Sequence, residues 1–355
     1  MSFNNIPLIK IGNLEIGLIQ GGMGVGISKD DLAAAVANEG GAGIIASVGL
    51  NFLNELDGNY NNHSTEAFRE TIRSARKKSN GVIGVNIMHV LTDYQQQVEA
   101  AVEEGVDLII SGAGIPKDLP SFLNGKDIKL LPIVSSARLA EMMCKAWSKY
   151  NHLPDGIIVE GPMAGGHLGF SREQLADPNF VRNGLARIVA EVIQVVKPYG
   201  IPVIAAGGIF YGGDIKKYQD LGAAGVQMAT RFVTTDECDA DIRFKQEYLG
   251  STKEDIIIID SPVGMPGRAI DNEFLAAVRR GETRPNKCGY HCIKSCKPRE
   301  TPYCIAASLI NAQKGKLENG YAFCGLNAHL CKEIVPVRKV FESLDAEYVS
   351  GKTSN

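Results

Sequence analysis

The chain has 355 residues, of which 45% are hydrophobic and 22% charged, and 39 are glycine. This length exceeds that of a usual single core, so we expect one large domain with an appendage. A formal net charge of −3 gives no extended positive field, which excludes nucleic acid and membrane surfaces as expected partners and favours a small-molecule substrate.

The expected compartment is the cytoplasm. No run of 18 apolar residues is present, and residues 1–17 lack the basic and apolar regions of a signal peptide. A chain of this size can bury a core without disulfides, so its eight cysteines are expected to be thiols or metal ligands. The sequence is compatible with a homodimer but does not determine the oligomeric state.

Eight short runs rich in Ile and Val predict the strands of a sheet. They cover residues 14–20, 42–47, 81–88, 106–111, 128–135, 154–160, 201–208 and 223–230. Each run is nearly continuously apolar rather than alternating, as expected for strands that are buried on both faces. The sheet should therefore be parallel.

Amphipathic segments between these runs predict helices. In the segment at 29–41 we expect Ser28 to cap the first turn and the glycines after Glu39 to end the helix. Strands that alternate with helices predict an α/β fold, a closed (β/α)8 TIM barrel from about residue 14 to 250 within a first domain at 1–262. An open, doubly wound sheet is the alternative.

The last part of the chain, 263–355, is predicted to be a helical, cysteine-rich extension packed on the barrel, with a final helix near 335–349. Its cysteines Cys288, Cys292, Cys296 and Cys304 follow the pattern C-x3-C-x3-C-x7-C. The first three could share one helical face and, with the fourth, hold an iron–sulfur cluster. Buried or reactive thiols are the alternative, so the metal ligands stay unassigned.

The segments that follow the predicted strands should meet at one end of the barrel, where such enzymes build their sites. Gly207, Gly208, Ala229 and Thr230 lie at the ends of predicted strands seven and eight, where barrels commonly bind phosphate through backbone N–H groups. The alternative is that these glycines only turn the chain. Asn86 lies inside an apolar strand and needs a partner there, either a protein group or a ligand.

His167 lies in the stretch EGPMAGGHLGF, between glycines and directly after a buried strand. We expect it on a loop at the barrel mouth with little steric cover. From there a neutral imidazole could reach a substrate as acid or base near neutral pH.

Several motifs in order resemble one family of flavin barrels: QGGMGVGIS, LAAAVANEGGAGIIAS, GVNIM, AGGHLGF, AAGGI and GVQMATRF. From about residue 1 to 270 the chain resembles the nitronate monooxygenase (2-nitropropane dioxygenase) family, which includes flavin-type enoyl-acyl-carrier-protein reductases. The resemblance implies non-covalent FMN at the open end of the barrel and His167 as the base that removes the proton α to a nitro group. The implied cofactor-binding residues are Gly22, Met23, Asn86, Glu160, Gly165, Gly207, Gly208, Gln227, Met228, Ala229 and Thr230.

Three positions bear on the branch of the family. Glu160 is typical of the reductases, whereas the monooxygenases often have Gln there; Met163 replaces an acid, and Ala229 replaces a glycine. The first hypothesis is an FMN enzyme that oxidises alkyl nitronates with O2 to a carbonyl compound and nitrite. The alternatives are an NAD(P)H-dependent enoyl thioester reductase and a flavin/iron–sulfur electron-transfer protein.

Overall fold

The structure is a computed structural model that describes residues 4–53, 60–282, 288 and 290–354. Eight parallel strands close a barrel, in which the last strand pairs with the first. They are β3 (Ile19–Gln20), β4 (Ala42–Ala46), β5 (Val82–Met88), β6 (Leu108–Gly112), β7 (Lys129–Val134), β8 (Ile157–Glu160), β10 (Val203–Ala206) and β11 (Gly225–Met228). The TIM barrel prediction is confirmed, and the open-sheet alternative is wrong.

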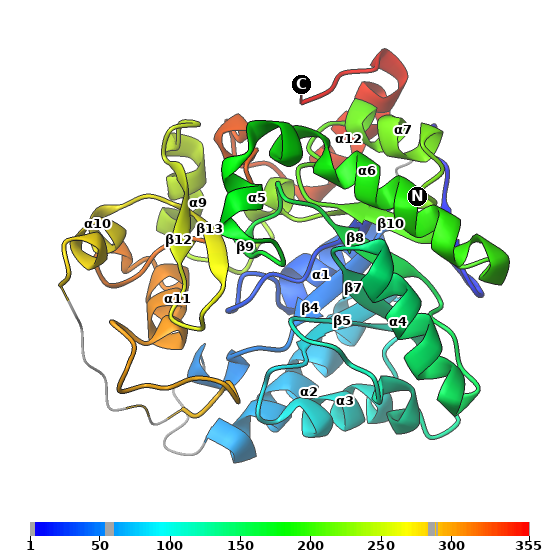
Figure 1. Cartoon of the computed structure of the whole chain (residues 1–355), viewed down its shortest axis with the longest axis horizontal. Coiled ribbons are helices and arrows are strands. Elements are labelled where there is room, and N and C mark those ends of the chain that lie inside the picture. Colours follow the sequence, from blue (N-terminus) through cyan, green and yellow to red (C-terminus); the bar gives the residue numbers. More distant parts are fainter. Residues whose placement is uncertain (1–3, 54–59, 283–287, 289, 355) are drawn as a thin grey trace.

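Helices surround the barrel, as Figure 1 shows. They are α1 (Asp30–Asn38), α2 (Tyr60–Lys78), α3 (Tyr94–Glu103), α4 (Ala137–Trp147), α5 (Arg172–Ala176), α6 (Pro178–Val196), α7 (Gly212–Asp220), α8 (Thr230–Val233) and α9 (Ile242–Gly250). One apolar core lies between these helices and the strands, and a second fills the barrel interior with side chains such as Ile44, Ile110 and Ile204. Within the described residues, no helix is long and apolar enough to cross a bilayer.

The first predicted strand segment is divided between two sheets. Only its end, β3, enters the barrel, whereas β2 (Leu14–Ile16) forms an antiparallel hairpin with β1 (Ile9–Ile11). The hairpin side chains Ile9, Ile11 and Ile16 are buried in the core of the barrel interior. One apolar run thus serves both as a barrel strand and as part of the plug that closes one end.

The start of α1 differs from the prediction. Its N-cap is Lys29, and Ser28 Oγ instead accepts a hydrogen bond from the Met23 amide at 2.9 Å. The carboxylate of Asp239 accepts hydrogen bonds from the amides of Lys29 and Leu32, so a distant residue replaces the expected local cap. The predicted end of the helix at the glycines after Glu39 is confirmed.

Beyond the barrel, β12 (Ile256–Asp260) and β13 (Pro266–Ile270) form a hairpin, and β13 also pairs with β9 (Gly166–His167). The helices that follow are α10 (Glu273–Arg279), α11 (Ile305–Gln313) and α12 (Val337–Ser350); α12 is the expected final helix and lies along α7 (Figure 1). Residue 262 falls inside the β12–β13 turn. A domain boundary at that residue stays a prediction.

The segment that holds the first three cysteines of the motif is not helical. Its backbone pairs with the chain after β5: Thr92 donates to the carbonyl of Cys292, and Lys294 donates to that of Val90. This pairing uses the groups that a helix would need, so the expected shared helical face of Cys288, Cys292 and Cys296 is wrong. The described residues contain no His, Cys, Asp or Glu cluster able to hold a metal ion, and the iron–sulfur prediction is therefore not supported.

Candidate active site

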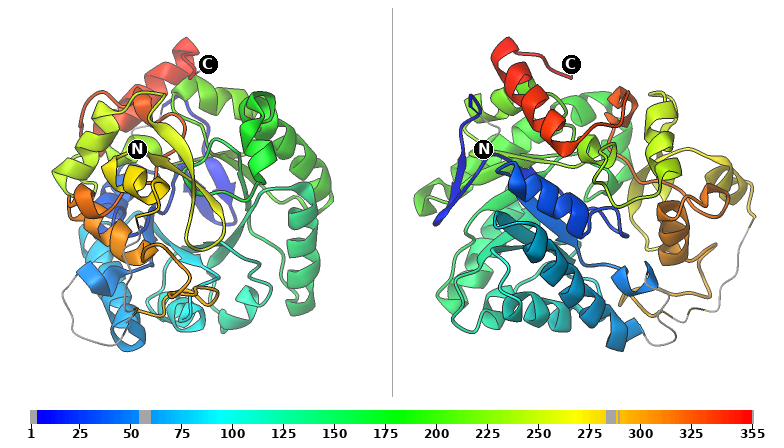
Figure 2. Two further views of the ribbon diagram at one scale, coloured as in Figure 1. Left: turned by 60° about the vertical axis from the view of Figure 1, so that its left-hand side comes forward. Right: turned by 180° about the vertical axis from the view of Figure 1, so that it is seen from behind.

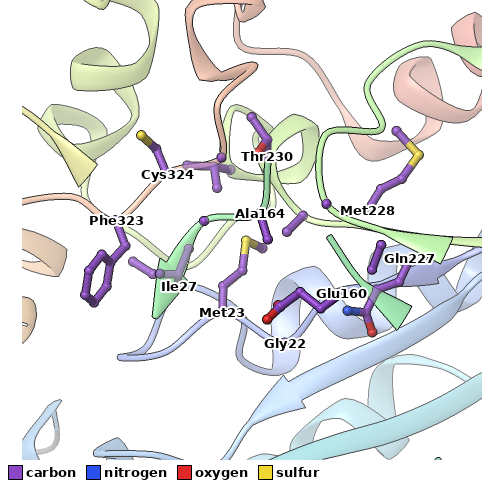
Figure 3. A pocket seen from close by; sticks show the side chains of 18 of the residues that line it. Gly22, Met23, Ile27, Glu160, Ala164, Gln227, Met228, Thr230, Phe323 and Cys324 are labelled. Atoms are coloured by element: carbon purple, nitrogen blue, oxygen red, sulfur yellow. The ribbon is translucent and has the colours of Figure 1, made fainter. Parts of the chain in front are cut away.

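Two cavities open at the ends of the barrel strands. The glycine-lined cavity, about 200 Å³, lies between the ends of β8, β10, β11 and β3 (Figure 3). The apolar cavity, about 490 Å³, lies beyond the ends of β4 to β8. The two cavities are neighbours, because they share part of their lining; the shared residues are Gly22, Gly24, Val25, Glu160, Gly166, Leu309 and Phe323.

The structure brings every predicted site residue to these cavities. The glycine-lined cavity is bordered by Gly22, Met23, Glu160, Gly165, Gly207, Gly208, Gln227, Met228, Ala229 and Thr230. Asn86 and His167 border the apolar cavity. The roles assigned to these residues stay predictions, but their common location agrees with the rule that barrel enzymes build sites from the loops after their strands.

Glycine is required at two places in this lining for different reasons. Gly208 has a φ of +85°, a conformation that residues with a Cβ rarely adopt. At Gly22 a Cβ would lie 2.4 Å from the Cβ of Asn86, so the asparagine can pack at the cavity only because that position has no side chain. The N-terminal glycine motif and the strand asparagine are thus one structural unit.

Glu160 and Gln227 are the polar side chains at the inner end of the glycine-lined cavity (Figure 3). They flank Ala206 in the barrel register. Burial raises the pKa of Glu160 to about 7, because the ionised carboxylate is poorly solvated there. The buried Oε1 of Gln227 has no hydrogen-bond partner within the described residues, and such an atom is costly unless a ligand satisfies it.

His167 is more enclosed than expected. It lies on β9, opposite Gly267 of β13, and its ring makes an edge contact with Phe323 at a centroid distance of 5.1 Å. Its Nε2 shares a hydrogen bond of 2.7 Å with Ser261 Oγ. The expectation of little steric cover is wrong, because the β12–β13 hairpin and Phe323, both far along the chain, pack against the imidazole.

Burial lowers the pKa of His167 to about 4, so the imidazole is neutral at pH 7. With Nε2 engaged by Ser261, the other ring nitrogen, Nδ1, is the one left to meet a substrate. A neutral imidazole beside an apolar cavity can accept a proton. The arrangement is therefore suited to proton abstraction from a carbon acid.

A family model described as nitronate monooxygenase matches residues 48–347. The chain belongs to the nitronate monooxygenase family. This membership confirms the resemblance inferred from the motifs and shows an oxidoreductase.

The chain is 28% identical over 305 residues to a probable nitronate monooxygenase of Staphylococcus haemolyticus. The match covers 79% of this chain and 82% of that relative. The chain is 29% identical over 275 residues to a (3aS,4S,5R,7aS)-5-hydroxy-7a-methyl-1-oxo-octahydro-1H-indene-4-carboxyl-CoA dehydrogenase of Mycobacterium tuberculosis, covering 78% and 68%.

Solved structures support the same fold. FabK of Thermotoga maritima is 29% identical, with a TM-score of 0.76 and coverage of 95% of this chain and 94% of that one. Nitroalkane oxidase of Streptomyces ansochromogenes is 21% identical, with a TM-score of 0.72 and coverage of 95% and 96%; it supports the fold alone.

Four residues of this nitronate monooxygenase family member were not predicted from sequence. The buried guanidinium of Arg268 donates to the carbonyls of Pro162 and Ala164, and so holds the loop that carries His167. The other three lie nearby: Ser261 shares a hydrogen bond with His167, Phe323 contacts its ring, and Leu309 borders the cavities. The isoleucine run at 256–259, followed by a turn that contains glycine, is a sequence signal for the β12–β13 hairpin. No feature of the sequence around it indicates that this hairpin packs against His167.

Proposed function

We propose that this protein is an FMN-dependent oxidoreductase that oxidises alkyl nitronates with O2 to a carbonyl compound and nitrite. The observation that carries the proposal is a neutral, Ser261-bound His167 in the apolar cavity, which adjoins the glycine-lined cavity. Family membership supports the oxidoreductase class, and the histidine supports chemistry that starts from an acidic C–H bond.

The residues present fit a flavin mononucleotide. The unpaired Oε1 of Gln227 can accept a hydrogen bond from a ring N–H, and the backbone at Gly208 and Thr230 can donate to phosphate. Gly22 and Asn86 would lie at the ring. When bound, FMN would accept the electrons that the substrate loses.

The protein's own groups would act on the substrate's proton and position. The neutral imidazole of His167 would accept the α-proton of a nitroalkane, and Ser261 would hold the ring in place during the transfer. Phe323 covers the ring and limits the access of water. A nitronate has already lost this proton and needs only to be bound and oriented.

The alternative is an NAD(P)H-dependent reductase of enoyl thioesters, favoured by the carboxylate at Glu160 and by the likeness to FabK. Anaerobic stopped-flow reduction of the FMN-loaded protein tests both. Rapid loss of flavin absorbance with a nitronate, and not with NADH or NADPH, is expected. If NADH or NADPH reduces the flavin and the nitronate does not, the proposal is overturned and the reductase is favoured.

Replacing Gln227 with Leu is expected to weaken FMN binding threefold to tenfold without lowering the stability of the cofactor-free protein. The reason is that the variant loses one hydrogen bond to the ligand while removing a buried acceptor that has no protein partner. Fluorescence titration of FMN measures the affinity. Gln219→Leu is the control, because its Oε1 is also unpaired but lies on α7, away from the site; equal effects of the two changes would contradict the assignment.

Replacing Ser261 with Ala is expected to lower kcat for nitroalkanes about tenfold, with KM and FMN content nearly unchanged, since the imidazole loses the hydroxyl that orients it. Steady-state kinetics with nitroethane measure this split. Ser261→Thr keeps the hydroxyl and should retain most of the activity. A general packing role for Ser261 would instead make both variants equally slow.

A further inference from the structure

We propose that the apolar cavity is a chamber for an extended alkyl chain, and that residues 290–309, here named the cysteine segment, form the wall that sets its length. This inference rests on the proposed function and names the substrate class of the same site. It also gives a role to Cys292 of the cysteine motif, which the proton transfer does not explain.

The chemistry of the lining is that of an aliphatic chain. Apart from the residues assigned to the cofactor and to proton transfer, the side chains that border the cavity are apolar except for Ser135; they include Met88, Ile115, Ile133, Met143 and Ile293. No lysine or arginine among the described residues borders it. Each methylene placed here leaves water, whereas a charged tail would lose its solvation without gaining a partner.

The cysteine segment closes this chamber from the outside. Ile293 forms a β-bridge with Leu91, and Thr92 Oγ1 donates to the carbonyl of His291 at 2.8 Å, so the segment is fastened to the chain that follows β5. Figure 2 (left) shows it, with α11, in front of the barrel strands. Helix α11 then presents Ile305 and Leu309, one turn apart, to the same cavity.

One cysteine of the segment, Cys292, is part of the apolar wall. Cys292 is buried, borders the cavity and packs on Ala306. Burial raises the pKa of its thiol to about 12, so it is protonated at neutral pH and behaves as a small hydrophobic side chain.

Binding of unbranched 1-alkanols, from butanol to decanol, tests the chamber by calorimetry on the purified protein. Affinity is expected to rise about threefold to fourfold with each methylene until the chamber is filled, and then to level off. Ile293→Trp should move this limit to chains shorter by at least two carbons, and Ile293→Ala should move it to longer ones. Ile258→Ala is the control, because this half-buried isoleucine does not border the cavity.

The same series is then run as nitronates from two to eight carbons, with kcat/KM as the measure. A parallel dependence on chain length supports the inference. Affinities that do not depend on length, or an Ile293→Trp variant with an unchanged limit, overturn it. Length-dependent alkanol binding without any nitronate turnover would overturn only the proposed function and leave the chamber in place.

Discussion

Replacing His167 with Ala is expected to lower kcat/KM for neutral nitroethane by about 10²–10⁴-fold while FMN stays bound. In the proposed mechanism the imidazole is the base, and among the described residues that border the apolar cavity the one other carboxylate or imidazole is Glu160. Steady-state oxygen consumption measures the loss, and the flavin spectrum of the purified variant shows whether the cofactor is retained.

Preformed ethyl nitronate separates the chemistry of His167 from a role in binding. The nitronate has already lost its α-proton, so the variant should retain its activity on the nitronate within about tenfold. Equal losses on both substrates would make His167 a binding residue.

The pH profile of the wild-type protein tests the same assignment. Because the pKa of His167 is about 4, activity on nitroethane is expected to fall as the pH drops through 4 and to be level above about 5.

Replacing Glu160 with Gln is expected to stabilise the cofactor-free protein by up to about 3 kcal/mol at pH 8.5 and by little at pH 4.5. The pKa of this carboxyl is raised from 4.5 to about 7 in the folded protein. A carboxyl with a raised pKa favours folding while it is protonated, and this contribution is lost as the pH rises through 7. The neutral amide avoids the cost of burying a charge.

Urea unfolding at several pH values measures this effect. The exposed Glu254 supplies the control: Glu254→Gln should change the free energy of unfolding by less than about 0.5 kcal/mol at every pH. A stabilisation by Glu160→Gln that does not depend on pH would show that folding does not raise the pKa of this carboxyl, and would contradict the prediction.

The barrel could be predicted from sequence because its signals are local. A strand buried on both faces must be apolar at nearly every position, and eight such runs separated by amphipathic segments leave few other folds. The gathering of Asn86, His167 and Gly208 at one mouth follows from the topology alone, since all loops after parallel strands emerge at the same end. No detailed contact needs to be known for either inference.

Tertiary structure decided the contacts that join distant segments. The acceptor that caps α1, Asp239, is 210 residues from Lys29, and the group that holds His167, Ser261, is 94 residues away. The spacing of Cys288, Cys292 and Cys296 is compatible with a helix, but in the folded protein this segment pairs with the chain after β5. Local patterns report which side chains are buried, whereas the partners of hydrogen-bonding groups depend on which segments the folded barrel brings together.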